Sequence, residues 1–117
     1  MSPPRYSQAN KLHPAVSNPN VKLVVLIDET TCSTSTITAL DVQDGKLGIV
    51  MGRTPIQAPN EYGNPLEQKL KYASFIVEIA TDAFTRTDPK ANLKEVVPDI
   101  AVPFGEDELQ AAFDYLK

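Results

Sequence analysis

Cysteine and histidine are nearly absent from this sequence, and their scarcity excludes several kinds of site. Cys32 is the only cysteine and His13 the only histidine in 117 residues. A single thiol cannot form a disulfide within the chain, and one cysteine with one histidine cannot complete a tetrahedral zinc site. The sequence therefore predicts no disulfide framework and no zinc centre, and we expect no cofactor.

Basic clusters and long apolar runs are also missing. The eleven Lys and Arg residues are scattered and the net charge is -4, whereas nucleic-acid-binding proteins gather positive charge on one surface. No apolar stretch approaches the roughly 20 residues that a membrane helix requires. The N-terminus also lacks the apolar core of a signal peptide. We expect no binding of nucleic acid and no membrane segment in this chain.

The length and composition set the domain organisation. A chain of 117 residues is one domain at most, and it is short for a complete enzyme with its own cleft. Residues 1–20 hold four prolines and three asparagines and show almost no apolar periodicity. This composition predicts an extended arm or linker over residues 1–20. Residues 21–117 then form the folded part.

The first half of the folded part predicts an α/β arrangement. The apolar runs "VKLVVLI" (21–27) and "LGIVMG" (47–52) are typical of strands buried on both faces. Between them the sequence predicts a short helix that ends at Gly45, because glycine commonly follows the last helical turn. Residues 53–65 are rich in Pro, Asn and Gly and predict a loop long enough to suggest a function.

The second half predicts further strands and a second helix. Residues 70–88 alternate apolar and polar side chains, which favours one or two strands. Residues 96–103 are interrupted by two prolines and predict an extended segment. Residues 105–117 begin with acids and continue with an apolar stripe at helical spacing, which predicts a helix. The members of that stripe are Leu109, Ala112, Phe113 and Leu116.

A hydroxyl-rich segment follows the first predicted strand. Residues 30–40 read "TTCSTSTITAL", so seven of the first nine side chains are hydroxyls. Ser and Thr are ordinary turn and helix-cap residues, which is the plainer interpretation. Alternatively, one of the serines is a nucleophile, because a helix N-terminus also offers backbone N–H groups that stabilise an oxyanion. The G-x-S-x-G pattern of the nucleophile elbow is absent.

The order of several motifs resembles the second half of the catalytic domain in the S41 serine peptidases, the C-terminal processing and tricorn-related proteases. The motifs are "VVLIDETTCSTSTITALDVQDGKLGIVMGRT", "NEYGNPLEQKLKY", "ATDAFTRTDP" and "VVPDIAV". They occur in the family's order and without large gaps over roughly residues 21–117. The resemblance implies a ClpP- and crotonase-like α/β fold, present here as a partial catalytic domain with buried strands and two helices.

The resemblance also implies site residues. Matching "QDGKLGIVMG" to the family's helix end and strand places the nucleophile on Ser33, with Ser35 as the alternative register. Thr34 then supplies the backbone N–H of an oxyanion hole. Asp88 is the preferred counterpart of the late catalytic acid, with Glu95 as the alternative.

The general base has no counterpart in the chain. In the branch that uses a Ser–Lys dyad, the lysine position falls near Ala58, and the branch that uses histidine carries it well before the serine. "GRTP" stands where the family usually has "GEPT". The resemblance therefore implies peptide hydrolysis through an acyl-enzyme that is incomplete in this chain.

The implied partners follow from that incompleteness. They are a peptide or unfolded protein substrate, and the N-terminal half of the peptidase domain or another copy of the chain. The alternative is a degenerate relative that binds peptides or proteins without catalysis. The resemblance favours a bacterial, extracytoplasmic parent protein, and the compartment of this chain is not predicted.

Overall fold

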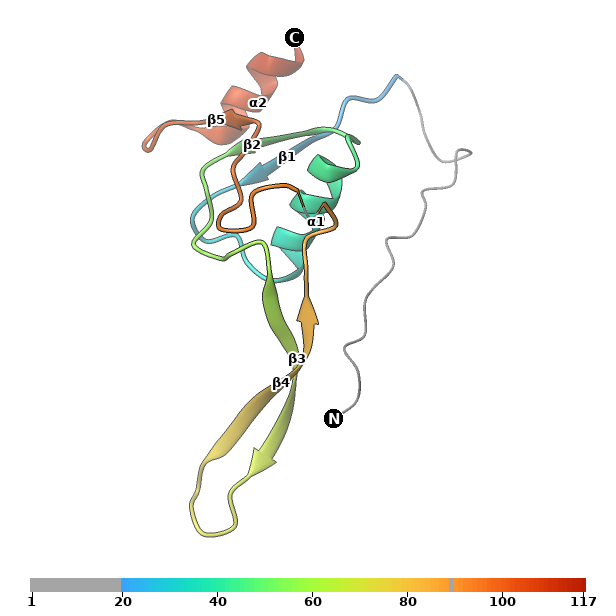
Figure 1. Ribbon diagram of the computed structural model, residues 1–117. Coiled ribbons are helices and arrows are strands. Elements are labelled where there is room, and N and C mark those ends of the chain that lie inside the picture. Colours follow the sequence, from blue (N-terminus) through green and yellow to red (C-terminus); the bar gives the residue numbers. More distant parts are fainter. Residues whose placement is uncertain (1–19, 89) are drawn as a thin grey trace.

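The computed structural model describes residues 20–88 and 90–117, and within them it has a small α/β body from which a β-hairpin projects (Figure 1). The body contains three parallel strands in the order β1, β2, β5. Their bounds are Val24–Ile27 for β1, Ile49–Gly52 for β2 and Ile100–Ala101 for β5. The two helices are α1 (Thr34–Asp44) and α2 (Glu108–Leu116). The prediction of an α/β fold with two helices is confirmed. The predicted arm over residues 1–20 lies almost entirely outside the described residues.

The sheet lies between the two helices, because its two faces contribute to different apolar clusters. On one face Ile27 and Val50 pack with Leu40 of α1 and with Val96. On the other face Met51 packs with Val102 and with Ala112 of α2. Successive residues of a strand point to opposite faces, which is how Val50 and Met51 come to belong to different clusters. The body is therefore a three-layer sandwich of helix, sheet and helix.

The strand predictions differ from the structure in depth of burial. β1 begins at Val24 and not at residue 21, and of its four residues only Ile27 is buried. β1 is an edge strand, since it pairs with β2 alone. The central strand β2 has the expected character, with Val50, Met51 and Gly52 all buried. A continuous apolar run thus identified both strands, but only the central one is covered on both faces.

The predicted loop over residues 53–65 is wrong in its second half. The loop ends at residue 60, and β3 (Glu61–Lys69) pairs antiparallel with β4 (Ile76–Phe84). Gly63, Asn64 and Pro65 all lie inside β3, and these are residues that normally interrupt strands. Pro65 is tolerated because a two-stranded hairpin has a free edge on each strand.

The second helix is less buried than its apolar stripe predicts. Ala112 is the buried member, whereas Leu109 and Phe113 remain 55% and 54% exposed. The helix start agrees with the acidic N-terminus, because the Asp107 carboxylate accepts hydrogen bonds from the backbone N–H groups of Leu109 and Gln110 at 2.9 and 3.1 Å. The helix is thus well capped but only partly covered by the rest of the chain.

Gly52 ends the central strand in a conformation that requires glycine. Its φ of +132° is unfavourable for other residues, and a Cβ at this position would lie 1.9 Å from the carbonyl oxygen of Ile27. We expect Gly52→Ala to lower the free energy of unfolding by at least about 2 kcal/mol, because both backbone strain and a clash with main-chain atoms oppose it.

Gly105 provides the matched control for this substitution. It also has a positive φ, +90°, but a Cβ there would meet no atom within 4 Å. Gly105→Ala should therefore cost only the strain, about 1 kcal/mol. Denaturant unfolding of both variants measures the difference, and equal losses would show that the Ile27 carbonyl is not the cause.

Candidate active site around Ser33

Ser33 is the last residue of the connection between β1 and α1 and occupies the N-cap position of α1. Its backbone has φ 55° and ψ -132°, a conformation that non-glycine residues rarely adopt. Such a conformation costs about 1–3 kcal/mol and persists only where the surroundings enforce it, which is often at a functional site. The side chain is exposed, directly before the helix N-terminus. A strained backbone is a feature that this position shares with the nucleophile-bearing turns of other hydrolases, although Ser33 lies six residues after the end of β1.

Four of the seven hydroxyls in this segment have structural roles. Thr30 and Thr31 donate to the Asp28 carboxylate from their hydroxyls at 2.8 and 3.2 Å and fold the turn after β1. The Thr36 and Thr38 hydroxyls donate back to main-chain oxygens, at 3.4 and 2.8 Å. The plainer interpretation, turn formation and local backbone bonding, is therefore correct for these four threonines.

The other three hydroxyls, those of Ser33, Thr34 and Ser35, form no hydrogen bond with the described residues. Ser33 stands at the N-cap position but its side chain makes no capping bond. The Thr34 N–H likewise has no partner within the described ranges, as is usual for the first residue of a helix. An uncapped serine hydroxyl thus lies next to an unpaired backbone N–H, and such N–H groups are the donors from which oxyanion holes are built.

The loop between β2 and β3 supports the strained turn. The side chain of Gln57 accepts a hydrogen bond from the Ser33 N–H through Oε1 and donates through Nε2 to Glu61 Oε2. The Ile56 N–H adds a main-chain bond to the Glu29 carbonyl at 3.3 Å. Neither Gln57 nor Glu61 was predicted as a site residue, because two polar residues four positions apart in a predicted loop do not indicate a contact with Ser33. The function suggested for this loop stays a prediction.

The turn after β1 is also stabilised by ionisation of Asp28. Its pKa is lowered below the usual 3.8, first by the hydrogen bond from the Thr30 hydroxyl and then by the Thr30 N–H. A carboxyl group whose pKa is lower in the folded state stabilises the fold above the unfolded pKa. Its contribution is lost as the pH falls through the folded pKa, so acid should loosen the segment that leads to Ser33.

Asp88 lies away from Ser33 in this structure. Its N–H donates to the Asp44 carboxylate at 3.3 Å, and Asp44 is the last residue of α1, whereas Ser33 precedes the first. Eleven helical residues span about 16 Å, so one helix length separates the two positions. Glu95, the alternative acid, is exposed. The structure therefore brings Ser33 and Thr34 together but does not bring Asp88 to them.

No basic group contacts the Ser33 side chain among the residues that the structure describes. Ala58, the counterpart of the dyad lysine, is exposed in the loop that contains Gln57. His13 lies outside the described residues. The same part of the chain contains no cluster of three or more His, Cys, Asp or Glu residues suited to a metal ion. It also contains no helix long and apolar enough to cross a membrane.

An open pocket of about 470 Å³ adjoins the serine turn. Val25 and Leu26 of β1 and Thr38 of α1 line it, together with Cys32 and Ser35, which flank the turn at Ser33. The pocket thus has an apolar strand on one side and hydroxyls on the other. Ser33 itself does not line the pocket, whereas Ser35 does.

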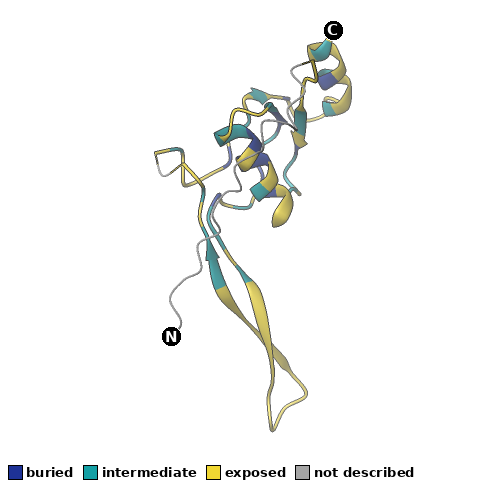
Figure 2. Cartoon of the chain, turned by 90° about the vertical axis from the view of Figure 1, so that its right-hand side faces the viewer, coloured by how far each residue is buried: buried dark blue, intermediate teal, exposed yellow. Residues whose placement is uncertain are grey.

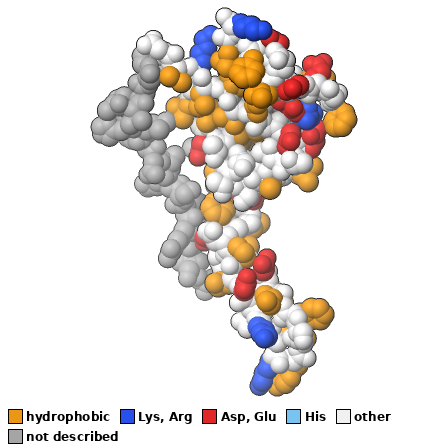
Figure 3. Space-filling model, turned by 180° about the vertical axis from the view of Figure 1, so that it is seen from behind, with side chains coloured by type: hydrophobic (Ala, Val, Ile, Leu, Met, Phe, Trp, Pro, Cys, Tyr) orange, Lys and Arg blue, Asp and Glu red, His pale blue; other side chains and the backbone are white. Residues whose placement is uncertain are grey.

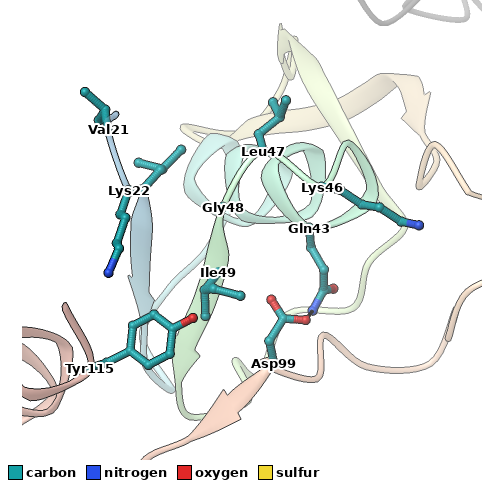
Figure 4. Close-up of a pocket in the computed structure, with 10 residues that line it drawn as sticks. Val21, Lys22, Gln43, Lys46, Leu47, Gly48, Ile49, Asp99 and Tyr115 are labelled. Carbon is teal, nitrogen blue, oxygen red and sulfur yellow. Dashed lines mark hydrogen bonds between the residues drawn. The ribbon is translucent and has the colours of Figure 1, made fainter. Parts of the chain in front are cut away.

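A larger pocket of about 550 Å³ lies at the opposite end of the strands (Figure 4). Leu23 and Gly48, which precede β1 and β2, line it together with Tyr115 of α2. Asp99 also faces it, but its carboxylate already accepts from the Val50 N–H at 2.8 Å and from the Gln43 amide at 2.9 Å. Ligands of parallel sheets bind at the carboxyl ends of the strands, so we place the candidate site at Ser33.

Strain at Ser33 has a measurable consequence. Glycine adopts positive φ without a Cβ penalty, so Ser33→Gly should raise the free energy of unfolding by about 1 kcal/mol. The control is Ser35→Gly inside α1, which should lower it by about the same amount because glycine is a poor helix former. A loss of stability in Ser33→Gly, measured by denaturant unfolding, would contradict the presence of strain.

Comparison with known proteins gives one match. The model of peptidase family S41 matches residues 2–102, most of the chain. No curated protein and no solved structure matches.

Proposed function

Because this chain belongs to peptidase family S41, we propose that it is the serine-bearing part of a serine peptidase. Ser33 would be the nucleophile, and the Thr34 N–H would be one donor of the oxyanion hole. The observation that carries the proposal is the strained backbone of Ser33, whose exposed hydroxyl makes no capping bond at the start of α1. A residue retained only to cap the helix would use its side-chain oxygen to do so.

The proposed reaction is peptide hydrolysis through an acyl-enzyme. The Ser33 oxygen attacks the scissile carbonyl carbon while a general base takes the hydroxyl proton, and the oxyanion is stabilised by the Thr34 N–H. The base returns the proton to the leaving amine as the C–N bond breaks. Water then hydrolyses the ester on Ser33 and restores the hydroxyl. Within the described residues no histidine or lysine is placed to be that base.

We propose that the base comes from another polypeptide segment, either the N-terminal half of an S41 domain or another copy of the chain. In this proposal the chain corresponds to the C-terminal part of a catalytic domain with a ClpP- and crotonase-like fold. Asp88 would be the acid that orients the general base from the other segment. This role requires a rearrangement that brings Asp88 toward Ser33. The family resemblance favours an extracytoplasmic bacterial parent.

A second candidate is a domain that binds peptides or proteins without cleaving them. The absence of a basic group at the Ser33 side chain, within the described part of the chain, favours it. In such a relative the serine turn would persist as a structural remnant, and the pocket beside it would bind a peptide side chain.

Labelling with a fluorophosphonate probe separates the two candidates. The chain is mixed with a polypeptide that carries the histidine-bearing half of an S41 domain, and the modified residue is located by peptide mass spectrometry. The proposal expects modification of Ser33, lost in Ser33→Ala and retained in Ser35→Ala. Modification of Ser35 would correct the register of the nucleophile, and no modification of either serine would favour the binding domain.

A further inference from the structure

The hairpin of β3 and β4 projects from the body without a covering layer (Figures 1 and 2). The Cα radius of gyration of 17.5 Å exceeds the roughly 13 Å of a compact domain of this size, which reflects the projection. Both strands are nine residues long, and most of their outer residues are exposed. A two-stranded hairpin is marginally stable alone and gains stability by packing a face against something else.

One face of the outer hairpin is apolar and carries no charge. Directly paired residues lie on the same face, and the pairs here are Leu66 with Ile79 and Gln68 with Val77. The next pair outward is Leu70 with Phe75, whose main chains are joined by a hydrogen bond of 3.1 Å. We call the six residues of these pairs the apolar face. Gln68 is its only polar member.

The opposite face of the same strands holds the charged side chains. Its pairs are Pro65 with Ala80, Glu67 with Glu78, and Lys69 with Ile76. Glu67 and Glu78 stand directly opposite each other, and the repulsion between their charges is tolerable only where water screens it. We therefore expect this face to stay exposed to solvent, which leaves the apolar face as the one available to a partner.

We propose that the apolar face is the dimerisation surface of this protein and that its occupant is the same face of a second copy of the chain. Leu66, Phe75 and Ile79 are 66%, 70% and 56% exposed. With Leu70 and Val77, which are 42% and 38% exposed, they offer on the order of 500 Å² of apolar surface per copy. Two copies would bury about 1,000 Å², which is the lower bound for a specific interface.

The charge distribution permits a copy of the same hairpin to bind. When two apolar faces meet about a two-fold axis, Glu67 and Glu78 of both copies point outward into solvent. No ionised group has to be desolvated, which is the cost that usually opposes such an interface. The space-filling view shows apolar side chains along the projecting hairpin, with acids and lysines beside them toward its tip (Figure 3). The result would be a four-stranded sandwich of two hairpins.

Sedimentation velocity over a concentration series tests this proposal. The full chain should show a monomer–dimer equilibrium with a dissociation constant in the micromolar range, as expected for an interface at the lower size limit. Leu66→Glu should raise that constant by at least about 100-fold, because it places an unpaired charge within the apolar face. The control Glu67→Gln lies one residue away on the charged face and should leave the dimer intact.

Three results would overturn the proposal. A wild-type chain that remains monomeric at about 100 μM leaves the apolar face to a partner of another kind. A dimer that persists in Leu66→Glu uses another surface, such as a free strand edge. Polydisperse aggregation that Leu66→Glu does not change would mean non-specific association. Circular dichroism of both variants verifies that they fold, and none of these outcomes depends on Ser33 being a nucleophile.

Discussion

Incubated alone with an unfolded protein substrate, this chain is expected to show no measurable peptide hydrolysis. The Ser33 hydroxyl is exposed and makes no capping bond, but no lysine or histidine contacts it within the described residues. Loss of a general base typically costs a factor of about 10² to 10⁴, and groups that act as a unit can cost about 10⁶. Stabilisation of an oxyanion by Thr34 alone would not restore observable turnover.

The assay follows release of fluorescent fragments from a labelled, unfolded protein, with the probe-labelling reaction run in parallel. Ser33→Ala is the control for both readouts. Cleavage by the wild-type chain that disappears in Ser33→Ala would contradict the expectation and show that this chain supplies its own base. His13 would then be the first residue to replace, since it is the only histidine in the sequence. Cleavage that persists in Ser33→Ala would indicate a contaminating peptidase.

The body of the fold was predictable because its signals are local. The apolar runs, Gly45 and the acids before α2 identified both helices and the two longer strands of the parallel sheet. The position of Ser33 between β1 and α1 followed from the same pattern and is confirmed. Its positive φ was not predictable, since it depends on support from Gln57 across 24 residues of sequence.

The hairpin was missed in part because its sequence violates strand preferences. Gly63, Asn64 and Pro65 indicated a loop, and only long-range pairing with residues 80–82 places them in β3. Strand propensity largely measures packing against neighbours, and the outer hairpin has few neighbours within this chain.

Several family motifs have structural roles at the end of α1. Gln43 of the "QD" pair donates to the Val97 carbonyl and to the Asp99 carboxylate of "VVPDIAV", both at 2.9 Å. Asp99 in turn accepts from the Val50 N–H at 2.8 Å and aligns β5 with β2. These residues therefore locate the sheet relative to α1. The ordered motifs on which the family resemblance rests describe the scaffold as much as the catalytic residues.

Arg86, from the motif "ATDAFTRTDP", also binds to the end of α1, where it forms a buried ion pair with Asp44. Its guanidinium donates to the Asp44 carboxylate from Nε at 3.0 Å and from Nη2 at 2.6 Å, and the two side chains are 6% and 7% exposed. Nη2 also donates to Gln43 Oε1 at 2.8 Å. We expect Arg86→Ala to lower the free energy of unfolding by about 3–5 kcal/mol, because it leaves the Asp44 carboxylate buried without its partner.

Two further variants identify the cause of this loss of stability. The free energy of unfolding of every variant is measured by denaturant unfolding at pH 7. The double variant Arg86→Met with Asp44→Leu should recover most of it, since it removes both charges and keeps the volume filled. Lys117→Ala, which breaks the exposed ion pair with Asp114, should produce no measurable change. Natural domains are stable by only about 5–15 kcal/mol, so Arg86→Ala should leave the chain close to unfolding. If the double variant is as unstable as Arg86→Ala, the hydrogen bonds of Arg86 to Gln43 and to the Asn92 carbonyl, and not the unpaired Asp44, determine the stability of this end of α1.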